Sequence, residues 1–272
     1  MPEELKSYST VRLNANQEHP TCEGIPPHTD VPRTVVSYGI TDVGLVRDHN
    51  EDSYSLLNLV GKSLYIVADG MGGHDAGEVA SKIAVETVNK VVRSGNGKGN
   101  NNSKLLEEAV LQANIDVREE GMFRESDMGT TLSAVLVADG VAFVANVGDS
   151  RVYWIENGSI TQVTTDHSLV AKLVTAGKLT REEARYHPRA NLLYRTIGSA
   201  QTLKIDIFRV LLKKGGTLLL CSDGLWGEVA DEDICRVCAE ERDATAAAMR
   251  LVRMANENGG KDNITVVIAK IG

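Results

Sequence analysis

The stretch Ser63-Leu64-Tyr65-Ile66-Val67-Ala68-Asp69-Gly70-Met71-Gly72-Gly73-His74 decides how the rest of the chain is interpreted. Its first six residues form an apolar run that is typical of a buried strand. The run ends at Asp69, and three of the next four residues are glycines. Because glycine lets the backbone approach a ligand closely, the pattern predicts an Asp at a sheet edge beside bare carbonyl groups, the donors that hard cations prefer. The alternative is a tight turn with a solvated Asp.

Other acidic residues also stand where apolar strands end or begin. Asp223 follows Leu218–Ser222, Asp149 follows Asn146-Val147-Gly148, Asp262 precedes the run 263–269, and Glu51-Asp52 precede the run 53–57. Carboxylates that converge on one sheet edge repel one another unless cations lie between them. The repetition therefore predicts a multi-carboxylate metal site. Mg²⁺ or Mn²⁺ is favoured over Zn²⁺ because the candidate ligands are oxygens.

Composition excludes several classes of protein. The 272 residues are 42% hydrophobic, which is enough for a core, and the net charge of -8 argues against a nucleic-acid surface. No run approaches the ~20 apolar residues of a membrane span, and the N-terminus lacks the pattern of a signal peptide. Cys235 and Cys238 are spaced as core residues of one helix rather than as a zinc site. We expect a protein of the reducing cytoplasm.

The chain divides into a leader and one folded domain. Residues 1–33 are polar and lack a sustained period, so we expect a flexible leader or an arm that docks elsewhere. The domain is expected over residues 34–272. Residues from 166 to about 200 are polar and helical in pattern, with Thr180 as a helix cap. We expect this segment to be a flap inserted between strands.

The domain alternates short strands with pairs of helices. The turns Asp139-Gly140 and Asn157-Gly158 predict antiparallel hairpins, and Ser103 is expected to cap the helix that follows it. Helices outside paired sheets are the expected arrangement. Strands are predicted at 34–39, 53–57, 63–68, 130–138, 141–147, 151–155, 160–164, 203–210, 217–221 and 264–271, and helices at 76–92, 104–120, 231–239 and 244–257.

Seven short motifs stand in the order that is typical of one enzyme family. They are Arg47-x-x-Asn50-Glu51-Asp52, Asp69-Gly70-Met71-Gly72-Gly73-His74, Gly129-Thr130-Thr131, Val147-Gly148-Asp149-Ser150-Arg151, Asp166-His167-Ser168, Ser222-Asp223-Gly224-Leu225 and Asp262-Asn263. With them the chain resembles the metal-dependent Ser/Thr protein phosphatases (PPM, type 2C) of the bacterial type. The resemblance implies an α+β fold, a four-layer α-β-β-α sandwich of two antiparallel sheets flanked by helices.

The resemblance also implies two Mn²⁺ or Mg²⁺ ions at one end of the sandwich. Asp69 would bridge the two ions, and Asp223 and Asp262 would complete one site. Glu51 and the carbonyl of Gly70 would complete the other site. Asp52 would lie behind them, and Asp127, together with Asp223, would bind a weaker third ion. Gly227 stands where many members carry an acid, which leaves the affinity for the third ion open.

The implied reaction is hydrolysis of phosphoserine and phosphothreonine by a hydroxide that bridges the two ions. Arg47 would hold the substrate phosphate, and Arg47 and Asp69 are the expected catalytic residues. Either His74 or a water could supply the proton for the leaving group, because Met71 stands where animal members have a His. Asp149 and Asp166-His167-Ser168 are expected to pin turns.

Three alternatives stay open from the sequence: a phosphatase of the type that acts on anti-sigma antagonists, a phosphatase of small phosphoesters, and a catalytically weak binding module. The expected partners are proteins phosphorylated on Ser or Thr, including a Ser/Thr kinase. We expect a monomer, with no nucleic-acid partner and no membrane span.

Overall fold

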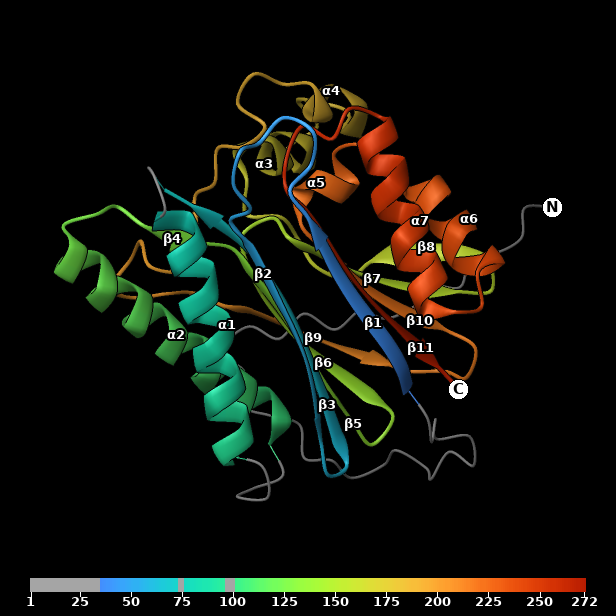
Figure 1. Ribbon diagram of the computed structural model, residues 1–272, viewed down its shortest axis with the longest axis horizontal. Coiled ribbons are helices and arrows are strands. Elements are labelled where there is room, and N and C mark those ends of the chain that lie inside the picture. Colours follow the sequence, from blue (N-terminus) through green and yellow to red (C-terminus); the bar gives the residue numbers. More distant parts are fainter. Residues whose placement is uncertain (1–34, 73–75, 96–100) are drawn as a thin grey trace.

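The computed structural model describes residues 35–72, 76–95 and 101–272 (Figure 1). The expected leader over residues 1–33 and the candidate acid His74 lie outside the described residues.

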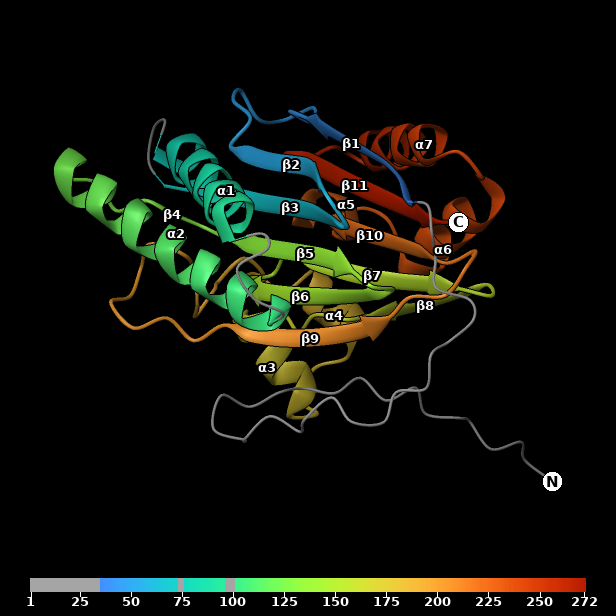
Figure 2. The same ribbon diagram turned by 90° about the horizontal axis from the view of Figure 1, so that it is seen from below.

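Two antiparallel sheets pack face to face (Figure 2). The first sheet has the strand order β1 (Val35–Asp42), β11 (Ile264–Ile271), β10 (Thr217–Cys221), β7 (Arg151–Glu156) and β8 (Ser159–Gln162). The second has the order β2 (Asp52–Leu59), β3 (Lys62–Met71), β5 (Leu132–Ala138), β6 (Val141–Val147) and β9 (Asp206–Leu211), with the short β4 (Gly129–Thr130) paired to the end of β3. Apolar side chains of both sheets, among them Tyr65, Val67, Leu218 and Leu220, form the core between them.

Helices cover the outer faces of both sheets. The helices α1 (Ala76–Gly95) and α2 (Asn102–Arg124) pack on the second sheet, where Leu64 and Ile66 of β3 point toward them. The helices α6 (Asp231–Glu240) and α7 (Ala244–Glu257) pack on the first sheet. Figure 2 shows the two pairs on opposite sides of the sandwich. Because the sheets have helices on one face and each other on the second, β3 is apolar on both faces. The expected four-layer sandwich is confirmed.

The segment between β8 and β9 contains α3 (Leu169–Thr175) and α4 (Arg181–Arg185). Thr180 caps α4 through a capping box with Glu183, as its position predicted. We call residues 166–200 the flap segment. Figure 1 shows α3 and α4 at the end of the sandwich where β1 runs into β2, beside the short helix α5 (Asp223–Trp226).

Three local expectations were wrong. The second helix begins at Asn102, and Asn101 rather than Ser103 is its cap, because the Asn101 side chain accepts the Lys104 N–H at 3.0 Å. The strand expected at 203–210 begins only at Asp206, where its pairing with β6 begins opposite Asn146. Asp223-Gly224, which repeat the Asp-Gly pattern of Asp69-Gly70 at the end of an apolar run, are not a strand-end turn of that kind but the first turn of α5. By contrast, Asp139 and Gly140 form the predicted hairpin turn, with φ of 50° and 74°.

The described cysteines behave as core residues. Cys221, Cys235 and Cys238 are buried and free, which agrees with the expectation that the Cys235–Cys238 pair is packed inside. Burial raises the pKa of the Cys238 thiol to about 12. No helix in the described part of the chain is long and apolar enough to cross a membrane.

Candidate metal centre

The acidic residues predicted for a metal site lie at one end of the sandwich, where β3 and β10 end and β2 and β11 begin. Asp52 and Asp69 are direct antiparallel partners on β2 and β3. Asp223 follows β10 and Asp262 precedes β11, and these strands are antiparallel neighbours. The N–H of Ser222 donates across to β11 at 3.1 Å, so the pairing continues up to Asp223. Strand pairing therefore joins Asp52 to Asp69 in one sheet and Asp223 to Asp262 in the other, and the packing of the two sheets brings these pairs to the same end.

Five aspartates form what we call the acidic cluster: Asp52, Asp69, Asp149, Asp223 and Asp262. Burial is the main cause that raises the pKa of Asp69 well above its usual range, and the charges of the other four raise it further. Burial and the charge of Asp223 raise the pKa of Asp149 in the same way. The cluster therefore holds more carboxyl groups than can ionise together without cations.

Asp69 and Asp223 lie close together, because the Asp69 carboxyl group lowers the pKa of Asp223 as a hydrogen-bonding neighbour. Two neighbouring carboxyl groups can share a hydrogen bond only if one of them carries a proton. Burial raises the pKa of Asp223, which favours that proton, although the contact with Asp69 and the charge of Arg47 act against it. A divalent ion between the two groups would take the place of the proton.

Two oxygens of the cluster have no partner. Asp52 Oδ1 and Asp223 Oδ1 are buried, and neither has a hydrogen bond within the described residues. The other oxygen of Asp52 accepts a hydrogen bond from the Ser222 hydroxyl at 2.7 Å. A buried acceptor that stays unpaired costs about 1–3 kcal/mol, and more when it is charged. These oxygens therefore fit a hard cation, although no three His, Cys, Asp or Glu side chains of the described chain already form a ligand cage.

Glu51 lies against the first turn of α1. Its backbone carbonyl accepts hydrogen bonds from the Gly70 N–H at 3.1 Å and from the Ser81 hydroxyl at 2.6 Å. A Cβ added at Gly77 would lie 2.4 Å from Glu51 Oε1, and one added at Gly70 would lie 2.1 Å from the Gly77 carbonyl oxygen. Burial raises the pKa of Glu51, although the charge of Arg47 and the Gly77 N–H lower it. The close backbone approach predicted around Gly70 is thus present.

Arg47 stands at the open side of the cluster. Its Nη2 group forms an ion pair with Asp262 Oδ2 at 2.8 Å, and its side chain is 47% exposed. Its charge also acts on Asp69 and Asp223. A guanidinium with one bond to the cluster and an exposed side can meet an anion that arrives from solvent.

Asp127 is exposed and lies just before β4. β4 pairs with the end of β3, so Met71 lies opposite Gly129. The Asp127 carbonyl oxygen is 3.4 Å from a Cβ built on Gly72. Asp127 is therefore at the same end of the molecule as the acidic cluster but outside its buried part.

Asp149, expected from the sequence both as one of the strand-end carboxylates and as a residue that pins a turn, lies in the acidic cluster. Asp149 is buried, and its carbonyl accepts a hydrogen bond from the Trp226 indole N–H at 3.1 Å. Its place at the end of an apolar run is the same signal that pointed to Asp69 and Asp223. Ser222 and Asn263 were missed, although both stand in motifs that were recognised.

The flap segment is tied to the acidic end. Arg151 forms an ion pair with Asp166 at 2.7 Å, and its guanidinium lies 3.7 Å over the ring of Trp226 in α5. The Gly148 N–H, next to Asp149, donates to His167 Nδ1 at 3.0 Å. The first residues of the flap segment therefore contact both sides of the turn that carries Asp149, and Arg151 links them to the helix that begins with Asp223.

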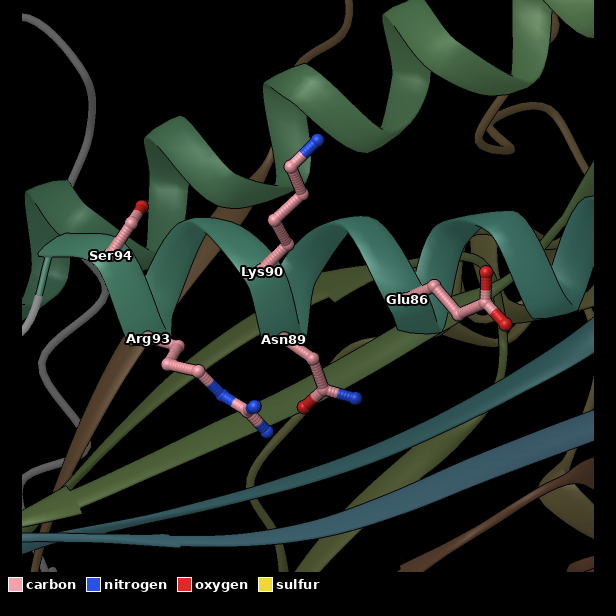
Figure 3. Close-up of a pocket in the computed structure, with 5 residues that line it drawn as sticks. All are labelled: Glu86, Asn89, Lys90, Arg93 and Ser94. Atoms are coloured by element: carbon pink, nitrogen blue, oxygen red, sulfur yellow. The ribbon is translucent and has the colours of Figure 1, made fainter.

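A surface hollow of about 510 Å³ lies elsewhere, on the later turns of α1 (Figure 3). It is lined by Glu86, Asn89, Lys90, Arg93 and Ser94. Glu51 contacts Gly77 at the opposite end of the same helix. The acidic cluster is thus an open rim of the sandwich rather than the floor of this hollow.

A family model and two similar proteins all point to protein phosphatases. The family model for protein phosphatase 2C matches residues 46–265. The serine/threonine phosphatase stp of Listeria monocytogenes serotype 4b is 37% identical over 238 residues, which cover 85% of this chain and 93% of that protein. The protein phosphatase PhpP of Streptococcus pneumoniae serotype 2 is 36% identical over 245 residues, with 85% and 96% covered.

Solved structures of bacterial phosphatases have the same fold. The Mycobacterium tuberculosis serine/threonine phosphatase PstP/Ppp superposes with a TM-score of 0.80 at 34% identity, covering 87% of this chain and 98% of that one. A structure described as the catalytic domain of PstP in complex with two manganese ions gives a TM-score of 0.78 at 33% identity, with the same coverage.

Proposed function

Because this chain belongs to the protein phosphatase 2C family and is a metal-dependent Ser/Thr protein phosphatase, we propose that its acidic cluster, with Glu51 and Arg47, is the active centre. Its substrates are phosphorylated proteins. The observation that carries the proposal is the convergence of Asp69 and Asp223 from different sheets, where the charge of Asp223 raises the pKa of Asp69 and the buried Oδ1 of Asp223 has no partner among the described residues. Such an arrangement costs stability unless a cation is bound.

The ligands we propose follow from the family resemblance and from the oxygens that the rim offers. Asp69 would lie between two ions, with Asp223 and Asp262 on one side and Glu51 and the Gly70 carbonyl on the other. Asp52 would lie behind Glu51 and the Gly70 carbonyl and support that site. Asp127 is the candidate ligand of a weaker third ion. We propose two Mn²⁺ ions, because a relative with 33% identity is described with two manganese ions. Mg²⁺ would suit the same oxygen ligands.

When bound, such ions supply positive charge for the phosphoryl oxygens and a water acidic enough to attack near neutral pH. The side chains of the protein bind and orient the phosphate. Arg47 offers a planar fork of N–H donors, and one nitrogen is engaged with Asp262, so a phosphate can be oriented by the others. The ion pair with Asp262 also aims the guanidinium at the rim.

We further propose that residues 166–200 act as a flap beside this centre. The support is the link from Arg151 to Asp166 and from Arg151 to Trp226, which joins the flap segment to the helix that begins with Asp223. A flap placed there would contact the substrate protein rather than the reacting phosphate. The expectations of a Ser/Thr kinase among the substrates, of a monomer and of a cytoplasmic protein remain predictions.

The test compares wild type with Asp223→Asn in the hydrolysis of p-nitrophenyl phosphate and of a phosphothreonine peptide, with Mn²⁺ and with EDTA. We expect metal-dependent turnover and a loss in the variant beyond about 100-fold, the upper end for residues that only support a metal ligand. Asp139→Asn is the control, because Asp139 is exposed in a hairpin turn at φ 50°, which Asn tolerates. Full activity of Asp223→Asn, or calorimetry that detects no Mn²⁺ binding by wild type, would overturn the proposal.

A further inference from the structure

We propose that Asn263 is a positioning residue for the phosphatase reaction: its side-chain amide holds the loop that carries Arg47 and Glu51 against the strand end that carries Asp262. The roles of Arg47 and Glu51 in this inference rest on the proposed function. The contacts of Asn263 do not, so the two can be tested separately.

The amide of Asn263 is fully used. Its Oδ1 accepts a hydrogen bond from the Glu51 N–H at 2.8 Å, and its Nδ2 donates to the carbonyls of Val43 and His49, each at 2.9 Å. The side chain is buried, with 5% exposure. One N–H donor and two carbonyl acceptors face the amide, so its orientation is determined by its partners. No other side chain of this size offers one acceptor and two donors.

The loop that Asn263 holds, residues 43–51, joins β1 in one sheet to β2 in the other and has neither helix nor strand of its own. Leu45 and Val46 are 69% and 65% exposed, so apolar burial contributes little to its position. The Leu45 N–H donates to the Gly260 carbonyl at 2.7 Å, the Asn50 amide donates to the Thr41 hydroxyl at 2.9 Å, and the Glu51 carbonyl has the two bonds described above. Hydrogen bonds therefore determine where this loop lies, and the single side chain of Asn263 supplies three of them.

The position of the loop decides where two functional side chains point. Arg47 is half exposed and has one ion pair, with Asp262, the residue directly before Asn263. Glu51 donates its own backbone N–H to Asn263. One amide thus links the loop that carries Arg47 and Glu51 directly to the strand end that carries Asp262. Loss of the amide should weaken phosphate binding through Arg47 and metal binding through Glu51, with the core of the sandwich intact.

The experiment compares Asn263→Ala with Asn114→Ala in the full chain. Asn114 is a matched control, because it is also buried and also bonds to two backbone groups, the Gly198 N–H and the Ala200 carbonyl, in the flap segment. Three quantities are measured: amide hydrogen exchange over residues 43–51, inhibition by inorganic phosphate, and Mn²⁺ affinity by calorimetry. We expect Asn263→Ala to accelerate the exchange and to weaken phosphate and Mn²⁺ binding by about 10-fold or more, and Asn114→Ala to do neither.

A double-mutant cycle separates positioning from general destabilisation. At Mn²⁺ concentrations that saturate every variant, so that the effect through Glu51 is removed, Asn263→Ala should change the inhibition constant of phosphate by less than about twofold once Arg47 is already Ala. The same fold-change with and without Arg47 would overturn the inference, as would unchanged exchange in residues 43–51. Should the Ala variant fail to fold, Asn263→Asp takes its place, because it keeps the size and the acceptor and loses both donors.

Failure of this inference can be distinguished from failure of the proposed function. A wild-type chain that binds Mn²⁺ and hydrolyses the phosphopeptide, with an Asn263→Ala variant equal to it in phosphate affinity, contradicts the inference alone. A wild-type chain without turnover contradicts the proposed function. In that case the exchange over residues 43–51 still decides whether Asn263 anchors the loop.

Discussion

The Ser222 hydroxyl donates a hydrogen bond to Asp52 Oδ2 at 2.7 Å and so joins the end of β10 in one sheet to the start of β2 in the other. The same hydroxyl oxygen accepts the Thr265 N–H at 2.9 Å. Ser222 is completely buried, and Asp52 is nearly so. One hydroxyl therefore connects the two sheets at the acidic end and supplies a partner to a carboxylate whose other oxygen has none.

Ser222→Ala should destabilise the protein by about 1–3 kcal/mol, because it leaves a buried carboxylate oxygen and a buried N–H unpaired. Urea denaturation of the metal-free protein measures the change. Ser63→Ala is the control, since the Ser63 hydroxyl bonds to Asn58 in an exposed hairpin, and its effect should stay within about 0.5 kcal/mol. Equal midpoints for the two variants would mean that the Ser222–Asp52 bond contributes nothing measurable.

Gly70→Ala should be destabilising by about 1–3 kcal/mol, the usual penalty for overpacking. The added Cβ would lie 2.1 Å from the Gly77 carbonyl oxygen and 2.6 Å from the Glu51 carbonyl oxygen, and both are backbone atoms that cannot rotate away. Gly61→Asn is the control, because a Cβ there meets nothing within 4 Å and Asn tolerates its φ of +73°. Thermal unfolding of the two variants tests the difference, and an unchanged midpoint for Gly70→Ala would show that the strand ends can move apart.

Much of the fold was predictable because its strands are apolar runs bounded by turn residues. The spans 141–147, 217–221, 244–257 and 264–271 were predicted to the residue. The start of α2 could not be predicted to the residue. Asn101 and Ser103 are equally good caps by residue type, and only the backbone geometry distinguishes them. The short helix α5 is too brief for any period to show.

For the site, the pattern of acidic residues at the ends of apolar strands predicts which residues take part. It does not predict which of their side chains contact one another. The structure brings Asp52, Asp69, Asp223 and Asp262 to one end. Which carboxyl groups touch depends on how the two sheets pack and twist, and no local pattern contains that information. The bond between Asn263 and a loop more than 200 residues earlier is of the same kind.

The Glu156–Lys213 pair predicts a dependence of stability on pH. Burial raises the pKa of Glu156, but hydrogen bonds from Lys213 and Trp154, each 2.7 Å long, outweigh it and leave the pKa below its ordinary value of 4.5. A carboxyl group with a lowered pKa in the folded state stabilises the protein above its unfolded pKa, and this contribution is lost as the pH falls through the folded pKa.

Glu156→Gln should therefore destabilise the protein by roughly 1 kcal/mol at pH 7, and the difference from wild type should shrink as the pH falls below 4.5. The measurement is urea denaturation at a series of pH values from 7 downward. A difference that is constant over this range would show that the carboxylate charge has no part in the effect.

Arg151→Lys should loosen the flap segment without unfolding the sandwich. The guanidinium of Arg151 bonds to Asp166 through two nitrogens and lies 3.7 Å over the Trp226 ring, and an ammonium can reproduce neither the fork nor the stacking. Because the pair is largely buried, a weakened partner should cost roughly 2 kcal/mol, between an exposed pair and a fully broken buried one.

Limited proteolysis of Arg151→Lys should cleave within residues 166–200 faster than in wild type, while the core strands remain protected, because the flap segment would open locally. Arg236→Lys is the control, since Arg236 pairs with Asp233 on the exposed surface of α6 and should leave cleavage unchanged. Equal cleavage of the flap segment in Arg151→Lys and wild type would mean that its hold on the sandwich lies elsewhere, for example in the bond between Gly148 and His167.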